Sequence, residues 1–380
     1  MALVTRNIWK GTDMGSRLGV LIKQHDGWEM HYGHWAAQTI GADIALDGFE
    51  ATMQRVRQME PLGIDTPFEW NQGPLVEGAL LIDQTNNTVV WVEESDGLYL
   101  PRIINALVER TWPGWTAVWS AEGKDGVLAA AGVDPDPLFT PFGYPGRTLE
   151  NTPWFGPWDD FELPDAMSVL LDNGTLVSWR GDASIDDVAD FGPDAIRSIA
   201  LQALTRSRQG EPLLWDEQIR DENPESGVHV DYQTQTLRWW SLIDDNTRIE
   251  GFVRFWPGWT IEPMGDNYEQ HQLILGRQMR RWTDDVAEAR EQLGRLIAEG
   301  MRKNPLLAMA ERLSAAGQEI QANAAALQFI PSGRTAARDI VMNHLERLAT
   351  EDPLPPARFI DRSGSIHTPR SPGDQPRHRI

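Results

Sequence analysis

Trp112-Pro113-Gly114-Trp115-Thr116 occurs a second time in this chain, as Trp256-Pro257-Gly258-Trp259-Thr260. Recurrence of five residues, two of them tryptophan, is very improbable by chance. Pro in the second and Gly in the third position of four are typical of a type II turn, because Pro restricts φ and Gly accepts a positive φ. The sequence therefore predicts the same corner, clamped by paired tryptophans, in two parts of the chain. We interpret its residues as structural; the alternative is a Trp stacking platform for a sugar or peptide.

The similarity between the two parts extends upstream of the corner, in the same order. Residues 78–91 match residues 226–239, and residues 67–70 match residues 212–215, at an offset of about 144 to 149 residues. An ordered set of matches at a nearly constant offset indicates an internal repeat. We therefore predict a tandem duplication.

Each copy is predicted to form a hairpin, a helix, a second hairpin and a final strand. The first hairpins turn at Asp26-Gly27 and Asn173-Gly174, dipeptides that suit the positive φ of tight hairpin turns. Helical spacing of apolar residues follows each hairpin. In copy one these residues are Phe49, Met53 and Val56, and in copy two Ile196, Ile199 and Ala203. We therefore expect an α+β fold with two pseudo-symmetric domains, residues 1–130 and 165–265.

The remaining segments differ in composition from the two copies. Residues 131–164 are rich in Pro, Gly and aromatic residues and are predicted to connect the copies. Residues 266–350 carry apolar residues at helical spacing and are predicted to be helical, with one helix near 335–348. Residues 351–380 contain many Pro and polar residues and are predicted to be a disordered tail.

The connector supplies the candidate partner-binding residues. It is predicted to pack in the groove between the copies; if part of it stays exposed, its aromatic and acidic residues would suit a basic protein. These candidates are Trp154, Trp158, Asp159, Asp160 and Glu162.

Composition narrows the classes of function. The net charge of -22 disfavours nucleic-acid binding, which normally requires a basic surface, and favours a basic protein partner or simply solubility. The chain has no cysteine, which excludes disulfides and thiolate metal sites and fits the cytoplasm. No apolar run is long enough to predict a membrane span. With 17 Trp and 5 Tyr, the chain is unusually rich in tryptophan, most of which we expect in the core.

No catalytic, cofactor or metal motif is recognisable, and we expect no cofactor and no metal. His25, His31 and His34 lie close together, but a strand would direct the last two to opposite faces. Asp83 and Asp231 occupy equivalent positions, where hairpin-turn chemistry explains an aspartate as well as a carboxylate pair would.

The apolar hairpin that ends in Trp91, followed by Arg110-Thr111-Trp112-Pro113-Gly114-Trp115-Thr116, resembles a group of uncharacterised bacterial proteins, mainly of high-GC Gram-positive type. The resemblance covers about the first 125 residues. It implies that the unit recurs in other proteins, and it implies no activity or site residues.

These observations favour a non-catalytic protein that binds another protein, as an immunity or antitoxin-type inhibitor or an assembly adaptor does. An enzyme, such as a hydrolase with its site between the copies, is the alternative, and a Trp-lined carbohydrate-binding protein is a third hypothesis. The C-terminal helices are predicted to mediate self-association or partner docking, or else to pack on the chain's own body.

Overall fold

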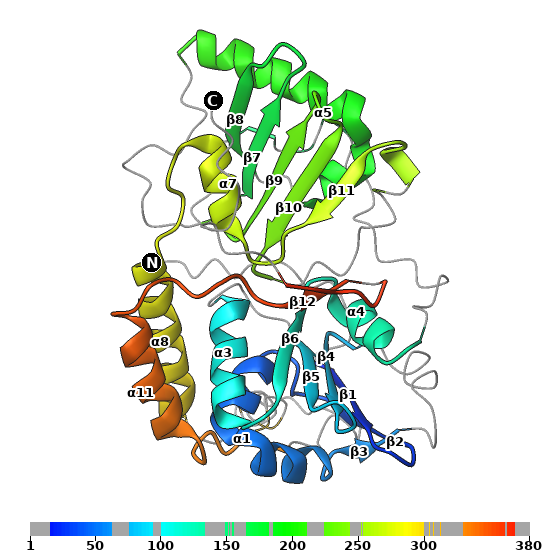
Figure 1. The fold of residues 1–380 in the computed structure, drawn as a ribbon, viewed down its shortest axis with the longest axis vertical. Coiled ribbons are helices and arrows are strands. Elements are labelled where there is room, and N and C mark those ends of the chain that lie inside the picture. Colours follow the sequence, from blue (N-terminus) through cyan, green and yellow to red (C-terminus); the bar gives the residue numbers. More distant parts are fainter. Residues whose placement is uncertain are drawn as a thin grey trace.

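The computed structural model describes residues 16–62, 76–93, 100–133, 149–150, 152, 154–155, 165–181, 185–210, 224–243, 252, 254–299, 304, 307, 312, 330–361 and 363–368. The predictions for Trp158, Asp159, Asp160 and Glu162 lie outside these residues. The described part of the chain is a mixed α+β protein with seven helices and two mixed sheets (Figure 1).

The first sheet contains eight strands in the order β13-β12-β6-β5-β4-β1-β2-β3. Its strands are β1 (Leu18–Lys23), β2 (Trp28–Gly33), β3 (Glu60–Pro61), β4 (Gly78–Asp83), β5 (Thr88–Val92), β6 (Thr116–Ser120), β12 (Phe359–Ile360) and β13 (Ile366–His367). The hairpin partners β1 and β2 are antiparallel, as are β4 and β5. Two parallel pairs, β1 with β4 and β5 with β6, join these hairpins and the last strand.

The second sheet contains five strands in the order β11-β10-β9-β7-β8. Its strands are β7 (Asp165–Leu170), β8 (Leu176–Gly181), β9 (Ser226–Asp231), β10 (Thr236–Ser241) and β11 (Thr260–Pro263). The pairs β7·β8 and β9·β10 are antiparallel, and β7·β9 and β10·β11 are parallel. Order and directions thus agree with those of β6-β5-β4-β1-β2 in the first sheet.

Helices cover both faces of each sheet. The helices are α1 (Ile40–Val56), α3 (Pro101–Thr111), α4 (Gly123–Ala130), α5 (Ile185–Arg208), α7 (Tyr268–Leu275), α8 (Trp282–Glu299) and α11 (Arg338–Leu348). In the first sheet α1 and α3 pack on one face and α4 on the other. In the second sheet α5 packs on one face and α7 lies across part of the other (Figure 1). Both α4 and α7 closely follow the last strand of their unit.

The two Trp corners have the same local geometry. Gly114 and Gly258 have φ of 82° and 81°, the positive value that the third position of a type II turn requires. Trp112 and Trp256 are buried, and each indole N–H donates to a carbonyl of the long helix packed against it, at 3.0 Å from Ile44 O and 3.0 Å from Val188 O. Each corner therefore ties the last strand of its unit to a helix.

Both long helices also break at a glycine in the same place. Gly48 in α1 has φ 71° and ψ 179°, and Gly192 in α5 has φ 73° and ψ 176°. Only glycine adopts this backbone conformation without strain. An added Cβ at Gly192 would lie 2.7 Å from Phe255 O, and at Gly48 3.4 Å from Thr111 O, both backbone atoms just before the Trp corner. The break lets each helix follow the corner closely.

The C-terminal part returns to the first unit. α8 packs against α11, and α11 packs against α1 and α3. A buried ionic group supports this contact: Arg334 donates to Asp43 at 2.7 Å through Nε, and its backbone N–H donates to Asp47 at 2.7 Å. Thus the described helices of this region cover the chain's own body.

The prediction of a disordered tail from residue 351 is wrong for part of that segment. Residues 352–360 form an extended strap that ends in β12, which pairs in parallel with β6. Phe359 and Ile360 are buried in the core, and Trp119 N donates to Arg358 O at 2.9 Å. Proline-rich composition suggested disorder, but an extended chain with two apolar residues can bind a sheet edge.

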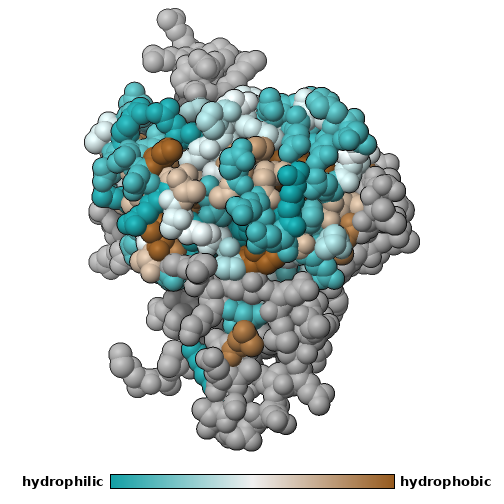
Figure 2. Space-filling model, turned by 90° about the horizontal axis from the view of Figure 1, so that it is seen from below, coloured by the Kyte–Doolittle hydropathy of each residue, from teal (hydrophilic) through white to brown (hydrophobic). Residues whose placement is uncertain are grey.

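No helix in the described ranges is both long and apolar enough to cross a lipid bilayer. Seen from the end that the first unit forms, the described surface is mainly hydrophilic, with hydrophobic residues in separate small areas (Figure 2). The buried apolar residues of this unit belong to two clusters, one of which continues into the second unit.

Candidate functional site

A row of polar residues crosses all five strands of the second sheet. The register pairs neighbours directly, so the row runs Ser178, Ser168, His229, Arg238 and Glu262, from β8 to β11. We call these five residues the polar row. They lie on the face that α7 partly covers, opposite the apolar face that packs on α5.

The equivalent row of the first sheet is entirely apolar. Its register gives Met30, Leu21, Leu81, Val90 and Val118 on β2, β1, β4, β5 and β6. All five belong to the apolar cluster beneath α4. One and the same strand arrangement therefore carries an apolar row in one unit and a polar row in the other.

Hydrogen bonds satisfy the buried centre of the polar row. Ser168 Oγ lies 2.7 Å from His229 Nδ1 and 2.7 Å from His271 Nε2, and Trp240 Nε1 donates to His271 Nδ1 at 3.1 Å. Because an indole nitrogen only donates, His271 Nδ1 accepts and its proton is on Nε2. His271 then donates to Ser168, and the Ser168 hydroxyl donates to His229 Nδ1.

Burial favours the neutral form of both histidines. Burial and the positive charge of Arg238 lower the pKa of His229 from 6.5 to about 4. Burial, together with neighbouring His229, lowers the pKa of His271 to about 3. A charge on either imidazole would be poorly solvated at these buried positions, so both stay neutral and the hydrogen-bond directions are fixed. The result is a hydrogen-bond relay that runs from α7 into the sheet.

A glycine makes room for the relay. A Cβ added to Gly227 would lie 2.5 Å from Trp240 Nε1 and 2.8 Å from His271 Nδ1, too close for either atom. The first unit has buried Ala79 at this register position. The absence of a side chain at Gly227 therefore leaves the space that His271 of α7 and Trp240 occupy on this sheet.

The polar row is buried at its centre and accessible at its ends. Ser168 is fully buried, so its hydroxyl is not open to a substrate in this structure. The side chains of Arg238 and Glu262, which pair at 2.6 Å, are 27% and 45% exposed. Leu176, two residues before Ser178 on β8, is 39% exposed. The accessible groups are thus a charged pair near the β11 edge of the sheet and an apolar side chain at the β8 edge.

The space between the two units contains paired charges among the described residues. Asp266 is fully buried; it accepts hydrogen bonds from Arg102 Nε at 2.9 Å and from Ala357 N at 2.8 Å. Burial opposes the charge on Arg102, but Asp266 and Glu269 outweigh it and raise the pKa of Arg102. These contacts join α3, the start of α7 and the strap, as expected of a structural joint.

The residues predicted as sites fall into different places. Trp154 is buried, with its indole N–H on Leu149 O at 3.2 Å and its ring 5.7 Å from that of Phe191. The expectation of an exposed partner contact at Trp154 is therefore wrong: the aromatic ring packs on α5. The residues of the two corners, Trp112, Pro113, Gly114, Trp115, Trp256, Pro257, Gly258 and Trp259, make the turns described above.

The other candidates remain separate from one another. Asp83 Oδ1 accepts from Thr85 N at 2.9 Å and Asp231 Oδ1 from Gln233 N at 2.8 Å, each within its own hairpin turn and in a different sheet. His31 is buried in β2, whereas His25 is exposed. In the described part of the chain, no three His, Asp or Glu side chains are grouped as metal ligands.

Analysis of the sequence missed the polar row, although its signal was present. The alignment that relates residues 78–91 to 226–239 places His229 opposite Leu81 and Arg238 opposite Val90. Polar residues in one sheet at positions that are apolar in a sheet of the same strand order indicate a difference in role between the two faces. The signal could not be recognised without knowing which positions share a sheet face.

Comparison with protein-family models, with curated proteins and with solved structures gave no match. The described part of the chain is a mixed α+β protein with two mixed sheets.

Proposed function

We propose that this protein is a non-catalytic binding protein that holds a basic protein on the polar face of its second sheet. The observation that carries the proposal is the replacement of a complete apolar row by a polar one. Buried polar groups such as Ser168 and His229 stabilise a fold less readily than apolar ones, so polar residues at five positions that are apolar in the first sheet indicate a role other than packing.

The proposal includes the origin of the two units. The shared strand order, the glycine breaks at Gly48 and Gly192 and the two Trp corners support a tandem duplication. In this view the domains are residues 1–130 and 165–265, and α7 extends the second unit beyond its predicted end. The first copy serves as scaffold and the second as binding module.

Chemistry at the accessible part of the face favours a protein ligand. The face carries the Arg238–Glu262 pair near one edge and the exposed Leu176 at the other edge, and such a mixture of polar and apolar groups is found at protein interfaces. The net charge of -22 favours a basic partner, because opposite charge accelerates encounter. Acidic and basic residues nearly balance in residues 266–380, so the negative charge belongs to the rest of the chain.

A photo-crosslinking amino acid tests the proposal. Placed at Leu176 in the native host, it is expected to capture a basic protein. The matched control is the same amino acid at Leu201, which is 48% exposed on α5. The captured protein, once purified, should associate several-fold more slowly at high than at low salt. Equal capture at both positions, or an association rate that salt leaves unchanged, would contradict the proposal.

A further inference from the structure

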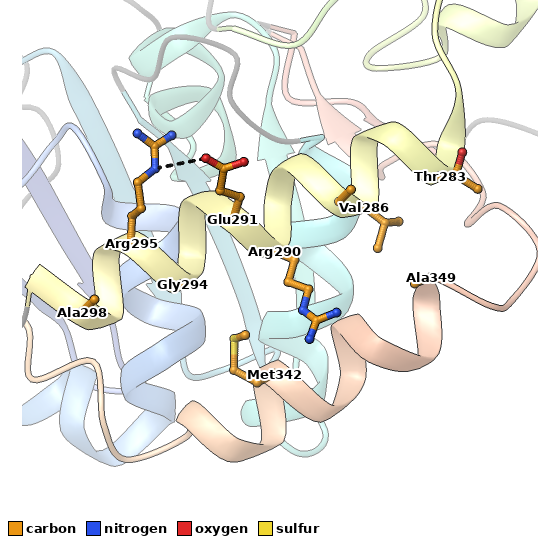
Figure 3. A pocket seen from close by; sticks show the side chains of 10 residues that line it. Thr283, Val286, Arg290, Glu291, Gly294, Arg295, Ala298, Met342 and Ala349 are labelled. Carbon is orange, nitrogen blue, oxygen red and sulfur yellow. Dashed lines mark ion pairs between the residues drawn. The ribbon is translucent and has the colours of Figure 1, made fainter.

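A groove of about 520 Å³ runs along α8 where α11 lies beside it (Figure 3). Small residues form much of its lining. They are Ala287, Gly294 and Ala298 of α8 and Ala349 just after α11. Small side chains leave the helix backbone accessible to a second helix.

No described residue packs against the Cα of Gly294 where a side chain would begin. This glycine lies in the interior of α8, and a Cβ added there would meet no atom within 4 Å. Glycine weakens the interior of a helix relative to alanine. Contacts among the described residues do not require a glycine at position 294. Close approach of a helix from outside the described residues would explain it.

Charged residues border the groove on both sides. On the α11 side, Arg290 pairs with Glu346 at 3.2 Å. On the other side Glu291 and Arg295 are one helical turn apart, with their charged groups 4.0 Å from each other, and Gly294 lies between the two borders (Figure 3). These side chains are more than half exposed and free to make further contacts.

We propose that this groove binds α8 of a second copy of the chain, antiparallel and about a two-fold axis. This axis places each charged border of the groove opposite the same border of the second copy, with the residues in the reverse order. Glu291 of one copy then faces Arg295 of the other, and Arg295 faces Glu291. The charges of this border are thus complementary to those of the same border in the second copy. A two-fold symmetric interface requires such self-complementarity, whereas binding of an unrelated partner does not.

The small residues complete the fit. With the two-fold axis near residue 293, Ala287 of one copy comes close to Ala298 of the other, and the two Gly294 backbones approach near the centre. The helices can therefore pack closely, while Arg290 and Glu346 close the α11 side. This inference is independent of the polar row, which lies on the second sheet.

A charge exchange in the full-length protein tests the interface. Light scattering across a range of protein concentrations should show a dimer for the natural sequence. Glu291→Arg and Arg295→Glu should each raise the dimer dissociation constant by at least about tenfold, because each makes the border repel its own copy. The double variant Glu291→Arg/Arg295→Glu should restore the dimer, since the border is again complementary to its reverse.

Gly294→Leu provides a test that does not depend on charge, because its side chain fills the groove and should give a monomer. Circular dichroism checks that each variant remains folded, which the exposure of these side chains favours. A natural protein that is monomeric at all concentrations overturns the proposal, whether another segment or another protein occupies the groove. So does a dimer that the single charge reversals and Gly294→Leu leave intact.

Discussion

In the first sheet the row from Met30 to Val118 is apolar and packs beneath α4, whereas in the second sheet the matching row from Ser178 to Glu262 is polar and only partly beneath α7. The opposite faces of both sheets remain apolar and pack on long helices that break at the same place. The face that packs on α1 or α5 is therefore the feature that the two units keep in common. The opposite face can carry polar instead of apolar residues when those polar groups form hydrogen bonds with one another.

A second difference lies at the edge of the sheets. In the first sheet Trp119 N donates to Arg358 O, which attaches the strap to β6. The register of β10 and β11 places Pro263 at the position of Trp119. Proline has no N–H to donate, so β11 cannot hold a strap in this register. Pro263 thus removes the hydrogen bond that the strap accepts from Trp119 in the first sheet.

The largest expected effect tests what the two units share. Trp112→Ala and Trp256→Ala should each lower the free energy of unfolding by about 3–5 kcal/mol, because each removes a buried ring and leaves a cavity. Urea unfolding followed by circular dichroism measures the loss, with Leu201→Ala on the exposed face of α5 as the control. A loss below about 1 kcal/mol at only one corner would show that the corners are not equivalent.

Exchanging residues between the rows should have unequal effects. Leu81→His places an imidazole without partners beneath α4 and should cost about 3 kcal/mol. His229→Leu removes one hydrogen-bond partner of Ser168 but fills the space with an apolar group, and should cost about 1 kcal/mol. The same unfolding measurement compares the two. If His229→Leu proved the more harmful, the relay would be essential to the fold rather than a tolerated difference.

Acid should act on the second unit through its histidines. Both have folded pKa values below the ordinary 6.5, about 4 for His229 and about 3 for His271, so the unfolded chain binds more protons as pH falls. Stability is therefore complete above about pH 6.5 and declines towards pH 4, by up to about 1.4 kcal/mol per pH unit for each histidine. Urea midpoints measured from neutral pH downwards give the slope. The variant His229→Leu/His271→Gln should flatten it, and an unchanged slope would assign acid sensitivity elsewhere.

The smallest expected effect on stability is at the accessible end of the polar row. Arg238→Val, which introduces the residue of the equivalent Val90, breaks a partly exposed ion pair and should change stability by less than about 1 kcal/mol. Binding of the captured partner should nevertheless be lost, as a titration with the purified protein would measure. Unchanged affinity would remove Arg238 from the binding surface.

Much of the local structure could be predicted from the sequence. The hairpin that turns at Asp26-Gly27 and the helix that ends at Leu348 are confirmed. Periodicity and turn residues determine such elements locally. The parallel pairing of β1 with β4 was not predicted, because strand order depends on contacts distant in sequence. The strap was missed for the same reason.

The candidate site was less predictable than the fold. A polar row across five strands is defined by register, and register between parallel strands leaves no local signal in the sequence. His271 joins the relay from a helix that was assigned to a separate helical region. Trp154 was a candidate partner contact only if its part of the connector stayed exposed, and burial of its large ring favours packing instead.

The strap has a consequence for the order in which the protein forms during synthesis. Ile360 fills part of the apolar cluster under α4, and α11 covers α1 and α3, so the first unit receives contacts from residues that are made after the strands of the second sheet. The second sheet and both of its helices are complete by residue 275. The half that leaves the ribosome first is thus finished last, and it exposes the β6 edge while the later half already has all its strands.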